Sequence, residues 1–227
     1  KKYSSDDIID RLKRLNGLKI LVIGDTIIDE YHYCRAVGKS PKESIISTKY
    51  LSEERFAGGV LACANHVAGF CKDVHLVTCL GTLDTKEDYI LDSLNPNVNP
   101  KFFYRDDACT VVKRRFVDPA FLTKMFEISF LEDHPLRREF SKKVCDHLES
   151  VVSDYDLVLT ADFGHGFIDD SIIDVLVKKS PFLAVNTQTN SANIGFNFIT
   201  KYPRADYICI DEPEIRLALQ NRFSDIR

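Results

Sequence analysis

Short apolar runs alternate with amphipathic segments along most of this chain. The first run covers residues 19–24, and similar runs follow at 74–80, 156–160, 182–185 and 207–210. Such runs are typical of strands buried on both faces of a parallel sheet. Helical patterns lie between them, at 60–71, 86–94, 136–152 and 168–179. The alternation predicts an α/β fold with a doubly wound, mainly parallel sheet. Ahead of the first run, Ser4 and Asp7 have the spacing of a capping box and predict a helix that ends before Gly17.

Two segments depart from this alternation. Residues 31–54 and 110–129 have strand-type composition with no helix between their strands. The second segment predicts a hairpin, with strands at 110–117 and 122–129. We expect a small antiparallel sheet standing off a single domain that covers residues 1–227. Two roles are open for such a sheet: a lid over the strand ends, and a ribbon through which two copies pair.

Composition and charge argue against several classes of protein. Thirty Lys and Arg against thirty-four Asp and Glu give a net charge of −4, which argues against nucleic-acid binding. Seven cysteines without C-x-x-C spacing indicate reduced thiols and no zinc site. The uncharged stretch 180–200 is too rich in Asn, Thr and Ser for a membrane helix. We therefore expect a cytoplasmic protein without a nucleic-acid or membrane partner.

Candidate site residues follow the predicted strands, because ligands of open α/β sheets bind outside the carboxyl ends of the strands. Asp29 is expected to face a cleft and accept hydrogen bonds from substrate hydroxyls, although Asp25 and Asp29 each also fit the support of a turn. Gly58 and Gly59 precede a helix and allow a ligand to approach the backbone closely.

The later strands are also followed by polar residues. A loop with two glycines, Asp162–Gly166, follows one strand, and the amide and hydroxyl cluster around Asn186 and Gln188 follows the next. For Asp211 and Glu214 two interpretations stand side by side. They have the spacing of a capping box, and they could organise the waters of Mg²⁺ near nucleotide phosphates.

Taken in order, these motifs resemble those of the ribokinase-like (PfkB) carbohydrate kinases, especially the kinase domain of bifunctional heptose-phosphate kinase/ADP-heptose synthase proteins. The resemblance rests on the order and spacing of several short motifs over nearly the whole chain: Gly24–Asp29, Ser40-Pro41, Gly58-Gly59, Lys113-Arg114, Asp162–Gly166 and Asp211–Glu214. It implies a ribokinase-like fold and transfer of the γ-phosphoryl group of ATP, with Mg²⁺, to a sugar or sugar phosphate. It also implies a role in nucleotide-activated sugar synthesis and a homodimer formed through the lid.

The resemblance also implies residue roles. The sugar or its phosphate would contact Asp29, Gly58, Gly59, Lys113 or Arg114, and Asp162. The nucleotide would lie near Asn186, Gln188 and Asp211, and Glu214 would hold Mg²⁺ through water.

Several departures from the family pattern affect the expected activity. Ala62 or Cys63 replaces an Asn of the family, Asp211 replaces another, and Asn186-Thr187-Gln188 stands where heptose-phosphate kinases commonly read Asp-Pro-Lys. The Gly-Ala-Gly-Asp motif that carries the catalytic base does not occur, so no residue of this sequence is assigned as catalytic. We expect an inactive N-terminal part of a longer kinase, and the resemblance implies a nucleotidyltransferase domain fused to it. The alternative is a non-catalytic sugar-binding or assembly module with a kinase fold.

Overall fold

A six-stranded parallel sheet forms the centre of the computed structural model, which describes residues 3–132 and 134–225. Its strands lie in the order β10-β9-β8-β1-β4-β5, and every neighbouring pair is parallel. Their bounds are β1 (Lys19–Gly24), β4 (Asp73–Gly81), β5 (Val98–Arg105), β8 (Leu157–Asp162), β9 (Leu183–Thr187) and β10 (Tyr207–Ile208). The predicted doubly wound, mainly parallel sheet is confirmed.

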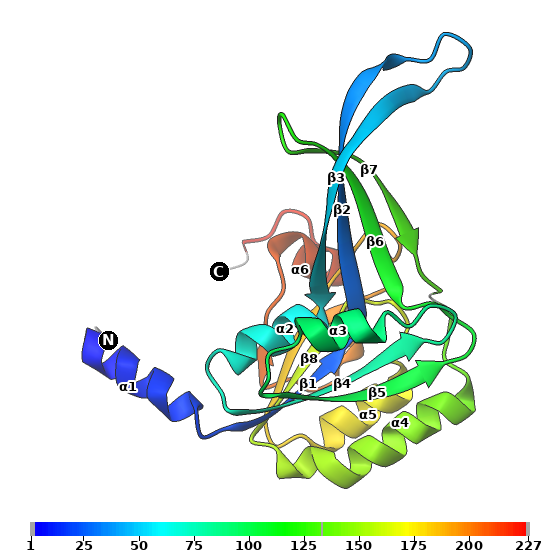
Figure 1. Cartoon of the computed structure of the whole chain (residues 1–227). Coiled ribbons are helices and arrows are strands. Elements are labelled where there is room, and N and C mark those ends of the chain that lie inside the picture. The colour runs from blue at the N-terminus through cyan, green and yellow to red at the C-terminus, as the bar shows by residue number, and fades with distance from the viewer. Residues whose placement is uncertain (1–2, 133, 226–227) are drawn as a thin grey trace.

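Helices cover both faces of this sheet (Figure 1). On one face, Leu21 and Ile23 of β1 pack in a cluster with α4 (Arg138–Val151) and α5 (Asp170–Lys179). On the other face, Val22 packs in a cluster with α2 (Val60–Ala68) and α3 (Glu87–Ser93). The side chains of Leu21, Val22 and Ile23 are fully buried, which explains the continuous apolar run at these positions.

The edge strand β5 was not predicted from the sequence. Its segment includes Pro100 and Lys101, and its burial alternates instead of running continuously. Proline lacks the N–H needed inside a sheet but is tolerated at an edge, where one side of the backbone has no partner strand. A search for continuous apolar runs therefore misses this strand.

A second sheet rises from the carboxyl ends of the first (Figure 1). Its order is β3-β2-β6-β7, with β2 (Thr26–Lys39), β3 (Ile46–Gly59), β6 (Val111–Asp118) and β7 (Thr123–Phe130). We refer to these four strands as the lid. The hairpins β2–β3 and β6–β7 are antiparallel, but β2 and β6 pair in parallel, so the lid is mixed and not antiparallel as expected. The reason is that both strands leave the same edge of the central sheet and run outward together.

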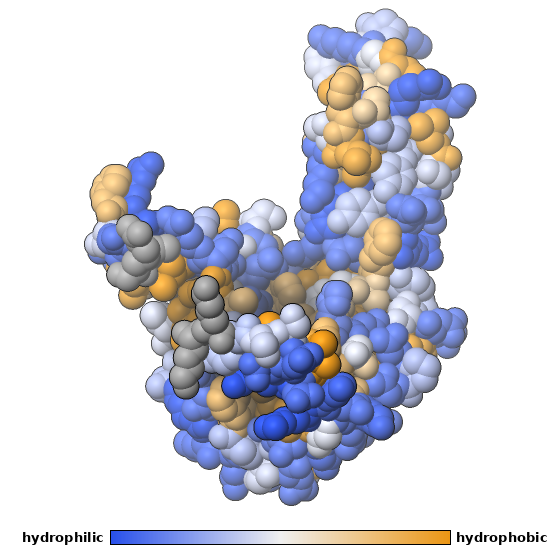
Figure 2. Space-filling model, turned by 90° about the vertical axis from the view of Figure 1, so that its left-hand side faces the viewer, coloured by the Kyte–Doolittle hydropathy of each residue, from blue (hydrophilic) through white to orange (hydrophobic). Residues whose placement is uncertain are grey.

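The remaining elements lie at the periphery. The helix α1 (Ser5–Leu15) carries the predicted capping box of Ser4 and Asp7 and buries none of its residues. Figure 2 shows the lid standing above the rest of the molecule, with a hollow beside its foot. The chain also forms η1 (Val152–Asp154), η2 (Ile199–Lys201) and α6 (Glu212–Ala218). Among the described residues, no helix has the length and apolar character required to cross a bilayer.

Candidate functional site

Asp25 lies at the base of the site, directly after β1. Its carboxylate is 2% exposed and accepts hydrogen bonds from three backbone N–H groups, those of Phe163 (2.9 Å), His165 (3.4 Å) and Phe167 (3.2 Å). These bonds shape the loop after β8 around the carboxylate. Asp25 therefore supports this turn, as was considered for it from the sequence.

Asp162, the last residue of β8, is surrounded by groups of the protein itself. Its Oδ2 accepts a hydrogen bond from the Tyr202 hydroxyl (2.7 Å) and lies 2.6 Å from Lys201 Nζ. Its Oδ1 accepts from Gly164 N (3.1 Å) and Asn197 Nδ2 (3.2 Å). Asp162 thus fastens the segment 188–202 to the central sheet, and its carboxylate is turned into the interior.

These two buried carboxylates affect each other and their neighbours. Burial, with a further contribution from Asp162, raises the pKa of Asp25 to about 6, and the three N–H donors oppose that rise. Burial and the charge of Asp162 raise the pKa of Tyr202 above its ordinary value. Tyr202 therefore remains a hydrogen-bond donor to Asp162 at neutral pH.

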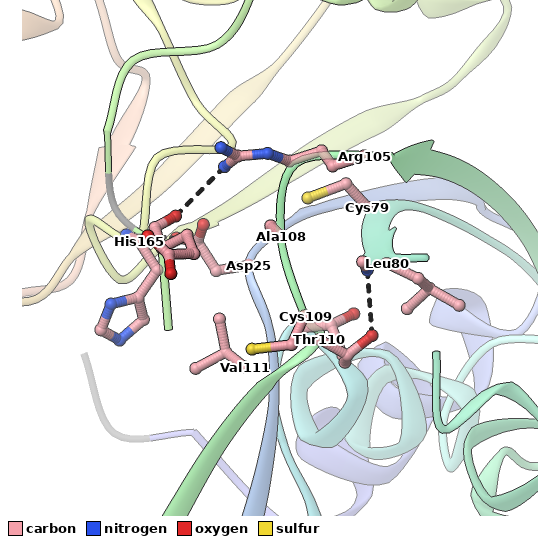
Figure 3. Close-up of a pocket in the computed structure, with 12 residues that line it drawn as sticks. Asp25, Cys79, Leu80, Arg105, Ala108, Cys109, Thr110, Val111 and His165 are labelled. Carbon is pink, nitrogen blue, oxygen red and sulfur yellow. Dashed lines mark hydrogen bonds between the residues drawn. The ribbon is translucent and has the colours of Figure 1, made fainter. Parts of the chain in front are cut away.

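A small cavity lies beside Asp25, between the ends of β1 and β4 and the start of β6 (Figure 3). Its volume is about 20 Å³, and Cys79, Arg105 and Thr110 contribute to its wall. The Oγ1 of Thr110 accepts a 3.0 Å hydrogen bond from Gly81 N (Figure 3). A cavity of this size holds about one water molecule, so a sugar has to bind outside it.

The lid presents two faces, because side chains alternate along each strand and paired residues share a face. We call one the cleft face, since it carries Lys113 and also Val111, which is two residues earlier on β6 and lines a cavity with Asp25. The register places these side chains on the cleft face: Asp29, Tyr31, Lys113, Arg115 and Glu127. The opposite, outer face carries Glu30, His32, Glu53, Arg55, Arg114, Phe126 and Ile128.

Asp29 and the two glycines come together at the root of the lid. Asp29 forms an ion pair with Arg115, and its Oδ2 lies where a side chain on Gly58 would be. A Cβ at residue 58 would overlap this oxygen, so only glycine fits. Gly59 has φ +56° and lies against the backbone oxygen of Asp25. The structure thus brings Gly58 against Asp29 and Gly59 against Asp25.

Lys113 and Arg114 lie on opposite faces. Lys113 is 8% exposed, and burial lowers its pKa, with Arg115 adding to the effect and nearby carboxylates opposing it. Its ammonium forms no ion pair with another residue of the part that the structure describes. Arg114 instead donates a 2.7 Å hydrogen bond from Nε to Glu30 on the outer face. The structure thus separates two residues that the sequence offered as alternatives.

Arg115 shares the cleft face with Lys113 and was not singled out from the sequence. Its Nε lies 2.8 Å from Glu127 Oε2, and its guanidinium lies over the ring of Tyr31 at 5.4 Å. The two-residue period of a strand was the signal that could have identified it. If Lys113 faces the cleft, residue 115 does too.

The segment expected near the nucleotide is held by backbone contacts. Asn186 donates from Nδ2 to Cys209 O at 2.6 Å. Asp211 Oδ1 accepts from Glu214 N (2.9 Å), while Glu214 Oε2 accepts from Asp211 N (3.0 Å). The capping box at the start of α6 is therefore confirmed.

A magnesium role for Glu214 does not fit this arrangement. Its second oxygen, Oε1, accepts a 2.8 Å hydrogen bond from Thr189 N, so both oxygens already bind backbone N–H groups. The side chain is also 9% exposed. Asp211 and Gln188 are exposed at the same end of the sheet. Within residues 3–132 and 134–225, no group of three or more potential ligands is placed to hold a metal ion.

Comparisons with known sequences find distant relatives. No family model matches the chain. A bifunctional protein HldE of Nitratiruptor sp. is 21% identical over 162 residues, which cover 71% of this chain and 34% of that protein. A protein of the same name from Campylobacter jejuni is 21% identical over 202 residues, covering 89% of this chain and 41% of that protein. The chain therefore spans about a third of the first of these relatives and two fifths of the second.

Solved structures show the fold more fully. A carbohydrate kinase from Agrobacterium tumefaciens aligns with a TM-score of 0.62 at 16% identity, over 88% of this chain and 63% of that chain. Phosphofructokinase-2 from Escherichia coli in complex with fructose-6-phosphate aligns with a TM-score of 0.65 at 8% identity, over 92% and 66%. The expected likeness to ribokinase-like carbohydrate kinases is confirmed, and at these identities it is a likeness of fold.

Proposed function

We propose that this chain forms the sugar-binding part and lid of an ATP-dependent carbohydrate kinase. The observation that carries the proposal is the convergence of Asp29, Gly58, Gly59 and Lys113 at one root of the lid, beside the carboxyl ends of β1 and β8. The fold of sugar kinases and the distant relatives named HldE support it. The finer proposal is a heptose-phosphate kinase whose product enters nucleotide-activated sugar synthesis.

On the acceptor side, Asp29 would accept hydrogen bonds from sugar hydroxyls, and the sugar would lie against the backbone at Gly58 and Gly59. Lys113 would bind a phosphate of the substrate, because its ammonium is held on the cleft face without an ion-pair partner among the described residues. Phosphoryl transfer depends mainly on positioning and on stabilising charge, which these groups would provide.

On the donor side, ATP would supply the phosphoryl group. Asn186 lies near the end of β9, Gln188 follows β9 and Asp211 follows β10. These three residues would contact the nucleotide. Magnesium ions neutralise charge on the phosphates in kinases. Since Glu214 does not fit as the holder of the ion, no step is assigned to it.

The test is an assay of ADP release by the complete encoded protein, with ATP, Mg²⁺ and a panel containing heptose 7-phosphate, fructose 6-phosphate and unphosphorylated sugars. We expect transfer to at least one sugar phosphate, reduced at least tenfold by Asp29→Asn. Absence of transfer to every acceptor would overturn the kinase proposal. Binding of a sugar without transfer would support the second candidate, a non-catalytic sugar-binding module, which the internal engagement of Asp162 and Glu214 favours.

We further propose that two copies pair through the outer face of the lid. Phe126, Ile128 and Phe130 of β7 are exposed, and Phe126 stacks on Phe116 at 4.5 Å. Figure 2 shows apolar residues among polar ones on this raised sheet. Light scattering on the complete protein should give a dimer mass that Phe126→Glu reduces to that of a monomer. A monomer mass for the unchanged protein would contradict the pairing.

A further inference from the structure

Arg115 links three strands of the lid from the cleft face. It belongs to β6 and forms ion pairs with Asp29 of β2 and Glu127 of β7. The Arg115 side chain is 15% exposed, so both pairs are partly shielded from water. Its guanidinium also lies over the Tyr31 ring. These contacts restrain the guanidinium from three sides.

The two oxygens of Asp29 have different surroundings. Oδ1 accepts the hydrogen bond from Arg115, whereas Oδ2 lies over Gly58. No residue in the described part of the chain donates a hydrogen bond to Oδ2. A carboxylate that is restrained through one oxygen and free at the other presents a hydrogen-bond acceptor in a fixed direction. Because Gly58 has no side chain, there is room at this position for Asp29 Oδ2.

We propose that Arg115 is a positioning residue that holds the Asp29 carboxylate so that Oδ2 accepts a substrate hydroxyl. This inference rests on the proposed function, in which Asp29 binds the sugar. Glu127 acts one step further away, by fixing the guanidinium from its Nε side. Arg115 thus affects sugar binding without touching the sugar.

The chemistry of the two pairs requires arginine and not merely a cation. A guanidinium presents several donors in one plane and can bind two carboxylates at once, whereas a lysine ammonium is a single flexible point charge. Arg115→Lys should therefore keep the charge but hold Asp29 less firmly. Arg115→Gln removes both the charge and the two-sided restraint.

The outer face offers a matched control. Arg55 also bridges two carboxylates, with Nε 3.2 Å from Glu30 Oε1 and Nη2 3.2 Å from Glu53 Oε1. Because it lies on the opposite face from Asp29, Arg55→Gln removes a similar ion-pair bridge from the lid without changing the cleft. Any effect that arises only from loosening the lid should be shared by both variants.

The test is a double-mutant cycle on the complete encoded protein, read as the dissociation constants of heptose 7-phosphate and fructose 6-phosphate by calorimetry. We expect Arg115→Gln to weaken binding of the preferred probe about tenfold, as for one lost hydrogen bond to a charged group. Arg115→Lys should recover part of this loss, and Arg55→Gln should change binding less than threefold. In the Asp29→Asn background, Arg115→Gln should cause little further loss, because both changes remove the same contact.

Three results would overturn the positioning role: unchanged affinity in Arg115→Gln, an equal loss in Arg55→Gln, or additive losses with Asp29→Asn. In each case the unchanged protein still binds its sugar phosphate, so the proposed function survives. If the unchanged protein binds neither probe nor any sugar of the panel, the proposed function fails and the positioning role fails with it.

Discussion

The hydroxyl of Tyr202 donates a 2.7 Å hydrogen bond to Oδ2 of Asp162, and both side chains are buried. The two residues are 40 positions apart, so the bond closes the whole segment after β9 against the end of β8. It also explains why a loop rich in asparagine has a defined conformation at this edge of the sheet.

Removing this hydroxyl should destabilise the protein. We expect Tyr202→Phe to lower the free energy of unfolding by about 1.5–3 kcal/mol, the usual contribution of a hydrogen bond to a charged group. Urea denaturation measures the effect. Tyr207→Phe is the control, because Tyr207 is 59% exposed and its loss of a hydroxyl should cost little. Equal stabilities for the two variants would contradict the role assigned to Tyr202.

Stability should depend on pH through Asp25. Its folded pKa of about 6 lies above the value of 3.8 for the free group, so the folded protein holds this proton more tightly than the unfolded chain. The contribution of Asp25 is therefore fully present below pH 3.8 and is lost as the pH rises through about 6.

The measurement for Asp25 compares the unchanged protein with Asp25→Asn. The difference in unfolding free energy between them should shift in favour of Asp25→Asn as the pH rises from 4 to 7. The comparison uses the slope against pH, so a constant loss from altered hydrogen bonds in the variant does not affect it. A difference independent of pH would show that Asp25 does not titrate in this range.

Gly58→Ala should weaken sugar binding by displacing Asp29. The added Cβ would overlap Asp29 Oδ2, and the carboxylate could move away only by straining its pair with Arg115. We expect at least a tenfold rise in the dissociation constant for the preferred sugar phosphate. In Gly17→Ala the new Cβ would meet only Arg14 O at 3.8 Å, an ordinary contact, so this control should bind normally. Unchanged affinity in Gly58→Ala would separate Asp29 from the sugar site.

The central sheet could be predicted because each of its inner strands is a mainly apolar run in the sequence. Leu21, Val22 and Ile23 pack alternately on both helix layers, which leaves an uninterrupted apolar run in the sequence. The edge strand with Pro100 carries no such run. The parallel pairing of β2 with β6 was also hidden, since it depends on where both strands leave the core and not on their composition.

The sequence predicted which residues lie near the candidate site. It did not predict which groups each carboxylate binds. Asp25, Asp29 and Asp162 all follow or approach strand ends in the sequence. Only the tertiary structure shows that Asp162 accepts a hydrogen bond from Tyr202 and pairs with Lys201. It also shows that Asp29 forms an ion pair with Arg115. The partners of a buried carboxylate come from distant parts of the chain, so local spacing does not reveal them.

Lys113 and Arg114 provide the sharpest test of the lid, because adjacent residues of one strand face opposite sides. Lys113→Gln removes a cation from the cleft face and should weaken binding of a sugar phosphate much more than binding of the unphosphorylated sugar. Arg114→Gln removes the same charge from the outer face, where Glu30 already pairs with it, and should leave the ratio of the two affinities unchanged. Calorimetric titration of both variants with both ligands measures this ratio. If Arg114→Gln alters the ratio as much as Lys113→Gln does, the assignment of the cleft face is wrong, since a charge on the far side of the sheet would then be binding the phosphate.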